Sequence, residues 1–175
     1  SAGDVNGDGY DDLIVGSVYL DDEEPGRAYV FLGGPSGLSQ EPHWVAYGIM
    51  GGEGLGYSVS SGGDGNGDGY DDVILGSPYY GASRYGRVQA FYGSPSGLSG
   101  TANWVVEADS TFTCRGHVVS GGSDVNGDGY DDVLVSGGSE LFYVFYGSSV
   151  GLSAEFFTTV SAPAWSSLGG DWLSV

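Results

Sequence analysis

The chain has 175 residues, enough for one domain with a sizeable core, and its 23 Asp and Glu against four Lys and Arg give a net charge of −19. Nucleic acids and anionic membranes bind basic surfaces, so neither is an expected partner, and no apolar run is long enough to insert as a membrane helix. The 35 Gly and the 14% of aromatic residues predict an all-β protein with many tight turns.

Two sequence markers recur along the chain and indicate internal repeats. The first marker reads Gly-Asp-Val-Asn-Gly-Asp-Gly-Tyr-Asp-Asp in its first copy, and its copies lie at 3–12, 63–72 and 123–132. The second reads Phe-Leu-Gly-Gly-Pro-Ser-Gly-Leu-Ser, and its copies lie at 31–39, 91–99 and 145–153. The markers predict three repeats of about 60 residues, at approximately 1–54, 55–114 and 115–169, the last of which lacks six residues between its two markers.

Each repeat is predicted to form four short strands, which is clearest in the second repeat. Residues 57–60 alternate, 72–76 form a continuous apolar run typical of a strand buried on both faces, 86–92 alternate again, and 103–107 follow a turn. No stretch has a sustained helical period. Four strands in each unit predict an all-β fold of propeller blades, each made of four antiparallel strands.

Three blades are too few to close a propeller, so the ends of the chain bear on its assembly. The chain starts where the first strand of the first blade would already have passed, and residues 168–175 resemble 55–60. We therefore expect a single module, 1–175, whose terminal strand 170–175 belongs to the next blade. That blade belongs either to a second copy, giving a dimer of six blades, or to the rest of a longer propeller chain.

The first marker has the chemistry of a calcium loop. Calcium takes six to eight oxygen ligands, and alternate residues of a tight loop point inward, so positions 1, 3, 5 and 9 offer side chains and position 7 a carbonyl. Position 12, where an EF-hand has Glu, is occupied by Val15, Leu75 and Val135, which excludes an EF-hand. Asx-turns between strands are the simpler alternative, but the carboxylates in each loop would repel one another without a cation.

These positions give the candidate metal ligands and predict three calcium ions per chain. The ligands are Asp4, Asn6, Asp8, Tyr10, Asp12, Asp64, Asn66, Asp68, Tyr70, Asp72, Asp124, Asn126, Asp128, Tyr130 and Asp132.

The pattern resembles the FG-GAP repeat, the blade of integrin α-subunit propellers and of many bacterial extracellular proteins. The three acidic loops look like the calcium loops of that family, Leu-Gly-Tyr-Ser-Val-Ser at 55–60 is similar to its first half, and Val-Ile-Leu-Gly-Ser-Pro at 73–78 to its second. The third repeat departs from the pattern, with Arg-Gly-His-Val at 115–118 and Ser-Gly-Gly at 136–138. The resemblance implies a calcium-stabilised propeller that serves adhesion or ligand binding, without naming a ligand.

Other residue types give weaker signals. His43 and His117 have no second His nearby in sequence, and Cys114 is alone, so structural roles are expected for all three. Trp44 and Trp104 occupy equivalent strand positions, where packing is favoured over stacking on a sugar. Residues 21–25 are expected to form an acidic, solvated loop.

We therefore predict a non-enzymatic, calcium-stabilised module, extracellular or at the cell surface, that works in adhesion or recognition of a protein or glycan. Two alternatives stay open beside it. One is a carbohydrate-binding lectin or a structural assembly subunit. The other is the propeller domain of a secreted hydrolase or lyase, which would need an acid–base set at the central axis.

Overall fold

The fold is taken from a computed structural model, which describes residues 1–18, 24–110, 114–137, 141–154 and 159–161. Within these ranges the chain forms eleven strands and no helix, and hence no helical segment that could cross a membrane. The predicted all-β class is therefore confirmed.

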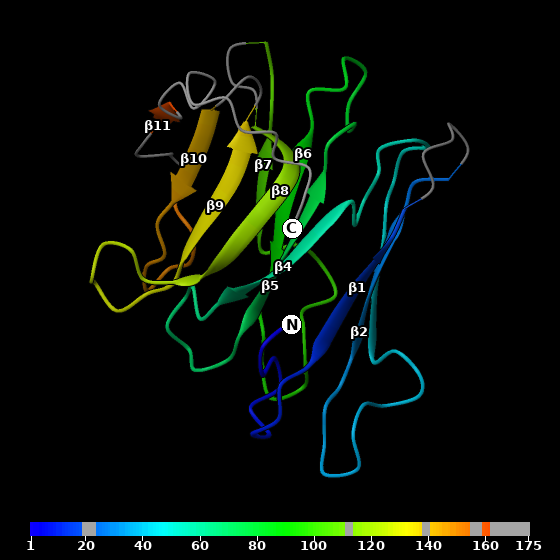
Figure 1. Cartoon of the computed structure of the whole chain (residues 1–175), viewed down its shortest axis with the longest axis vertical. Coiled ribbons are helices and arrows are strands. Elements are labelled where there is room, and N and C mark those ends of the chain that lie inside the picture. Colours follow the sequence, from blue (N-terminus) through cyan, green and yellow to red (C-terminus); the bar gives the residue numbers. More distant parts are fainter. Residues whose placement is uncertain (19–23, 111–113, 138–140, 155–158, 162–175) are drawn as a thin grey trace, which may run out of the picture.

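The strands form three antiparallel sheets that follow one another in the chain. The first sheet contains β1 (Leu13–Ser17), β2 (Arg27–Phe31) and β3 (Trp44–Tyr47), in that order. The second contains β4 (Ser58–Gly63), β5 (Asp72–Ser77), β6 (Arg87–Phe91) and β7 (Trp104–Glu107). The third contains β8 (Cys114–Ser123), β9 (Asp132–Gly137), β10 (Leu141–Phe145) and β11 (Thr159–Ser161). Figure 1 shows the sheets side by side, as in part of an all-β propeller, and we call them blades 1, 2 and 3.

The four strands expected in the second repeat are present, and the first of them is longer than predicted. β4 continues past Ser60 to Gly63, where a register shift between Ser61 and Gly63 allows Gly63 to pair with Asp72. Such a bulge bends the strand into the acidic loop that follows. The predicted terminal strand 170–175 lies outside the described residues.

Two apolar clusters hold the blades together, one at each boundary. Val73 and Leu75 of β5 point to blade 1, where they join Ile14 and Val30. Ile74, between them in sequence, points to blade 3 and packs with Val135. Successive side chains of a strand face opposite sides of its sheet, so a continuous apolar run serves both neighbours of blade 2. This is the physical reason for the apolar run that the sequence contains at 72–76.

Two pairs of glycines allow the blades to approach closely. A Cβ on Gly16 would overlap the carbonyl oxygen of Gly56 in the next blade, and a Cβ on Gly76 would overlap that of Gly116. The main chains therefore touch at both boundaries, which explains glycine at these four positions.

Candidate metal centre

The first acidic loop folds around the carboxylate of Asp4. One oxygen of that carboxylate accepts hydrogen bonds from the backbone N–H groups of Gly7 (2.8 Å) and Asp8 (3.1 Å), and the other accepts one from Gly9 (2.8 Å). The Asn6 side chain donates to the Asp8 carboxylate at 3.1 Å, and Asp8 accepts the N–H of Tyr10 at 3.0 Å. The side chains at positions 1, 3 and 5 are thus gathered in one tight loop.

The other two loops repeat this arrangement. Gly69 donates to Asp64 at 2.8 Å, and Asn66 donates to Asp68 at 2.9 Å. In the third loop Gly129 donates to Asp124, again at 2.8 Å, and Asn126 to Asp128 at 2.9 Å. Similar local sequences thus form similar local hydrogen bonds, as expected for Asp and Asn in turns.

The Asp at position 9 connects each loop to the second marker of its own repeat. One carboxylate oxygen of Asp12 accepts the N–H of Val5 at 3.0 Å, and the other accepts that of Gly33 at 2.8 Å. Asp72 makes the same pair of bonds with Gly65 (3.2 Å) and Gly93 (3.0 Å). In the third repeat the partners of Asp132 are Val125 (2.9 Å) and Gly147 (3.0 Å). Each of these carboxylates is therefore buried at the base of its loop and held in a fixed orientation.

In the first two loops the environment is unfavourable for the carboxylate at position 9, whereas in the third the backbone N–H of Gly129 lowers the pKa of Asp124. Burial raises the pKa of Asp72 to about 7, against the opposing effect of the N–H groups of Gly93 and Gly65, and the charges of Asp68 and Asp64 add to the increase. Burial also raises the pKa of Asp12, and the charges of Asp8 and Asp4 act in the same direction. A divalent cation beside these groups would reverse the local potential.

The donor set fits a hard cation such as calcium. Each loop offers carboxylate, amide and carbonyl oxygens, and a carboxylate oxygen that accepts one N–H keeps a further lone pair. Among the described residues no group of three or more Asp, Glu, His or Cys side chains is arranged to hold a metal. The loops gather two such side chains with an Asn, so a bound ion would also use the amide, the carbonyl of position 7 and the Asp at position 9.

Sequence reasoning missed the role of the Asp at position 8. Asp71 accepts the N–H of Asp4 at 2.7 Å, and Asp131 accepts the N–H of Asp64 at 3.0 Å, so both reach the loop of the preceding blade. Burial raises the pKa of Asp71, as do the charges of Asp131, Asp4 and Asp11. The signal was present in the sequence, because every copy of the first marker ends in two Asp residues, of which only the second was assigned.

A buried ion pair between blades 1 and 2 was also missed. Arg87 contacts Glu53 at 3.2 Å, and both side chains are almost fully enclosed. Glu53 accepts the N–H groups of Ile49 and Met50, each at 3.2 Å, and the guanidinium of Arg87 lies 3.9 Å from the ring centre of Tyr80. The repeats contain no second copy of Glu53, so the repeat pattern gave no signal for it.

The two Trp residues that were weighed as sugar platforms lie at blade boundaries. Trp44 donates from Nε1 to the carbonyl of Ser99 in the next blade at 2.8 Å and packs edge-on against Phe91. Trp104 makes the same contacts with Ser153, at 2.8 Å, and Phe145. Packing between blades, the expected role, accounts for both side chains.

His117, one of the two histidines of the chain, belongs to an aromatic cluster. The rings of Tyr57, Tyr79 and His117 lie edge to face, with centres 5.3–6.0 Å apart. His43 lies elsewhere, with Nε2 3.3 Å from the carbonyl oxygen of Ser96.

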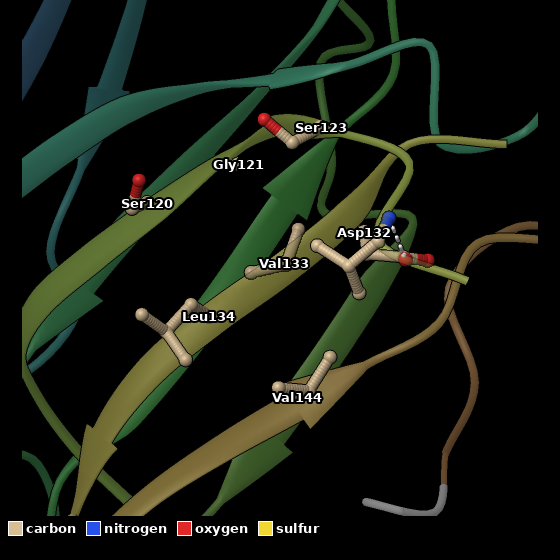
Figure 2. Close-up of a pocket in the computed structure, with 8 residues that line it drawn as sticks. Ser120, Gly121, Ser123, Asp132, Val133, Leu134 and Val144 are labelled. Atoms are coloured by element: carbon tan, nitrogen blue, oxygen red, sulfur yellow. Dashed lines mark hydrogen bonds between the residues drawn. The ribbon is translucent and has the colours of Figure 1, made fainter. Parts of the chain in front are cut away.

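The outer face of blade 3 contains a shallow pocket beside its acidic loop. Figure 2 shows Val133, Leu134 and Val144 lining it, with the buried carboxylate of Asp132 at one end. The dashed line in Figure 2 is the hydrogen bond from the Val125 N–H to that carboxylate. The corresponding face of blade 2 is covered by blade 3, so this pocket is part of a surface on which no described blade packs.

Comparison with known proteins agrees with this arrangement of blades and loops. The model of the FG-GAP repeat matches residues 1–31, 55–91 and 115–149. The chain is 33% identical to integrin alpha-5 of Xenopus laevis over 146 residues, which cover 77% of this chain and 14% of that protein. It is 34% identical to integrin alpha-PS2 of Drosophila melanogaster over 163 residues (81% and 11%) and 36% identical to integrin alpha-IIb of Mus musculus over 142 residues (75% and 14%). The chain thus spans about a seventh or less of the length of these relatives, and it belongs to the FG-GAP repeat family.

Proposed function

We propose that this chain is a calcium-stabilised, non-catalytic module of an extracellular or cell-surface propeller that serves adhesion or ligand recognition. The module consists of the three repeats at about 1–54, 55–114 and 115–169. The observation that carries the proposal is the same Asp–Asn–Asp arrangement in three loops, one for each blade. The similarity to integrin α-subunits, named above, supports the extracellular assignment.

Charge supports calcium over the simpler alternative of plain turns. The hydrogen bonds within a loop would hold the turn without an ion, but they do not remove the repulsion between its carboxylates. The chain has four basic residues, all Arg, and none lies within an acidic loop. Calcium would neutralise the loops directly, and at the millimolar concentrations outside cells even weak sites are filled.

Metal analysis tests the proposal. After dialysis against buffer with calcium, the protein should retain close to three ions per chain, bound by the residues at positions 1, 3, 5, 7 and 9 of each loop. Mass action predicts that the Tm rises with calcium concentration. A ligand at ten times its Kd adds about 1.4 kcal/mol per site to the free energy of unfolding. A bound calcium content close to zero, together with a Tm that is the same in calcium and in excess chelator, would contradict the proposal.

Variants of the loops serve as matched controls. Asp8→Ala, Asp68→Ala and Asp128→Ala each remove the position 5 ligand from one loop, so each should lower the calcium content by about one ion. A variant that lowered the Tm without lowering the calcium content would indicate a turn residue rather than a ligand.

A protein or glycan ligand is the expected partner, and the Tyr57–Tyr79–His117 cluster is a candidate contact for it. Tyr57 is 42% exposed, and exposed aromatic rings are frequent anchors of binding surfaces. The edge-to-face geometry is that of packed aromatic rings. A glycan array would separate the lectin alternative from protein recognition.

The outer faces of blades 1 and 3 support assembly with further blades. Leu13 and Val15 are partly exposed on blade 1, as is Leu134 on blade 3. The additional blades belong either to a second copy, in a six-bladed dimer, or to the rest of a longer polypeptide. Light scattering distinguishes the two, because only the first doubles the 18.0 kDa mass of the isolated chain.

A further inference from the structure

Successive acidic loops are joined to each other at the residue that starts each loop. The backbone N–H of Asp4 donates to the carboxylate of Asp71 at 2.7 Å, and the backbone N–H of Asp71 donates in return to the carbonyl of Asp4 at 3.2 Å. Asp64 and Asp131 exchange the same two bonds, at 3.0 Å and 3.2 Å. The position 1 residue of one loop is therefore held on both sides by the position 8 residue of the next.

The residues around this contact are adapted to it. A Cβ on Gly3 would overlap the carboxylate of Asp71, and a Cβ on Gly63 would overlap that of Asp131. The ring of Tyr70 covers Gly7 so closely that a Cβ there would lie 2.6 Å from its Cε1, and Tyr130 covers Gly67 in the same way. Each loop thus packs against its neighbour through glycines that leave room for the Asp and Tyr of the following blade.

The position of Asp71 in its own loop gives the contact a consequence for metal binding. Asp71 lies between Tyr70 and Asp72, the proposed position 7 and position 9 ligands of the second loop. An ion in the second loop would fix both neighbours of Asp71 and hence fix Asp71 against Asp4, the position 1 ligand of the first loop. Ordering one loop therefore reduces the cost of ordering the other.

We propose that Asp71 and Asp131 are positioning residues that couple neighbouring calcium loops, so that an ion in one loop strengthens calcium binding in the next. The inference rests on the calcium binding proposed above. Coupling of this kind is reciprocal, since each ion must favour the other by the same factor, and typical couplings lie between about 5-fold and 150-fold. We expect about tenfold for each pair of loops.

Asp11 provides a matched control for Asp71. It occupies position 8 of the first loop, it is exposed, and no described loop precedes it. In calcium titrations by calorimetry, Asp71→Ala should weaken one site about tenfold, whereas Asp11→Ala should leave all sites within about twofold of the wild type. Asp71→Asn keeps an oxygen that accepts the Asp4 N–H, so it should restore most of the affinity.

A double-mutant cycle separates coupling from simple damage to the second loop. Asp8→Ala removes the ion of the first loop, so adding Asp71→Ala to it should not weaken the two remaining sites further. If Asp71 merely stabilised its own loop, the second site would weaken in both backgrounds. Should Asp71→Ala fail to fold in calcium, the same cycle is made with Asp131→Ala and Asp68→Ala, which address the second and third loops.

The outcomes distinguish this inference from the function on which it rests. A wild-type chain that takes up no calcium overturns the calcium proposal itself. A wild-type chain that binds three ions, with equal affinities in Asp71→Ala and Asp11→Ala, overturns the coupling and leaves calcium binding intact.

Discussion

Blade 2 has a neighbour on each side, whereas blades 1 and 3 each have a described neighbour on one side only. Equivalent residues in their strands therefore differ in how deeply they are buried. Leu75 in β5 is fully buried, but Val15, its equivalent in β1, is 40% exposed. Ile74 is buried as well, and its equivalent Leu134 in β9 is 38% exposed. The strands share one apolar pattern, so the pattern alone does not determine burial. A residue is buried where another blade covers its face.

Two equivalent Arg residues show the same contrast for charge. Arg87 in blade 2 pairs with Glu53 at 3.2 Å inside the protein. Arg27, 60 residues earlier, pairs with Glu24 at 3.5 Å on the surface, where both side chains are about half exposed. Removing one member of a buried pair leaves a charge without compensation, whereas solvent screens an exposed pair. These matched positions allow the comparison to be tested.

The largest effect is expected for Arg87→Met. This change leaves the Glu53 carboxylate buried without its ion-pair partner and should lower the free energy of unfolding by about 3–5 kcal/mol at pH 7. Urea unfolding in calcium provides the measurement. Arg27→Met is the control and should leave stability close to that of the wild type; equal losses in both variants would refute the distinction between the blades.

The loss in Arg87→Met should depend on pH. Burial raises the pKa of Glu53 above its ordinary 4.5, against the opposing effects of Arg87 and of the N–H groups of Ile49 and Met50. The stability that this group contributes is therefore fully present below about pH 4.5 and is lost as the pH rises through the folded-state pKa. Without Arg87 the pKa rises further, so the deficit of the variant should shrink as the pH falls from 7 toward 4.5. A deficit independent of pH would argue against a buried charge as its cause.

A smaller effect is expected from matched apolar truncations. Ile74→Ala removes a side chain buried between blades 2 and 3 and should cost about 2–5 kcal/mol. Leu134→Ala removes a similar volume from the open face of blade 3 and should cost less than half as much in this chain. Within an assembly that covers blade 3 the loss in Leu134→Ala should approach that in Ile74→Ala, and a large loss in the isolated chain would indicate that the face is already covered.

The smallest effect is expected from the Trp hydrogen bonds. Trp104→Phe keeps the aromatic packing against Phe145 but removes the donor to the carbonyl of Ser153, at a cost of about 0.5–1.5 kcal/mol. Trp44→Phe should cost less, because Trp44 is half-buried while Trp104 is 7% exposed. Urea midpoints of the two variants provide the test. A larger loss of stability in Trp44→Phe than in Trp104→Phe would contradict the link between burial of the Trp side chain and the strength of its hydrogen bond.

Much of the architecture was predictable from the sequence because it depends on neighbours in the chain. The period of 60 residues, the strands of each repeat and the fold of the acidic loops follow from local alternation and from short-range hydrogen bonds. Asp4, Asn6 and Asp8 lie within five residues, so the geometry that gathers them is set almost entirely by that segment.

Residues at equivalent positions of the repeats differ in role, and these differences were decided by the tertiary structure. Asp11 and Asp71 share one local sequence, but only Asp71 has a described preceding loop to bind, and that loop lies 67 residues earlier. Glu53 and Arg87 become a buried pair because blade 2 packs on blade 1, a contact across 34 residues that has no copy in the other repeats. Local patterns determine which groups a segment presents, whereas the electrostatic environment and burial of each group depend on the blades packed around it.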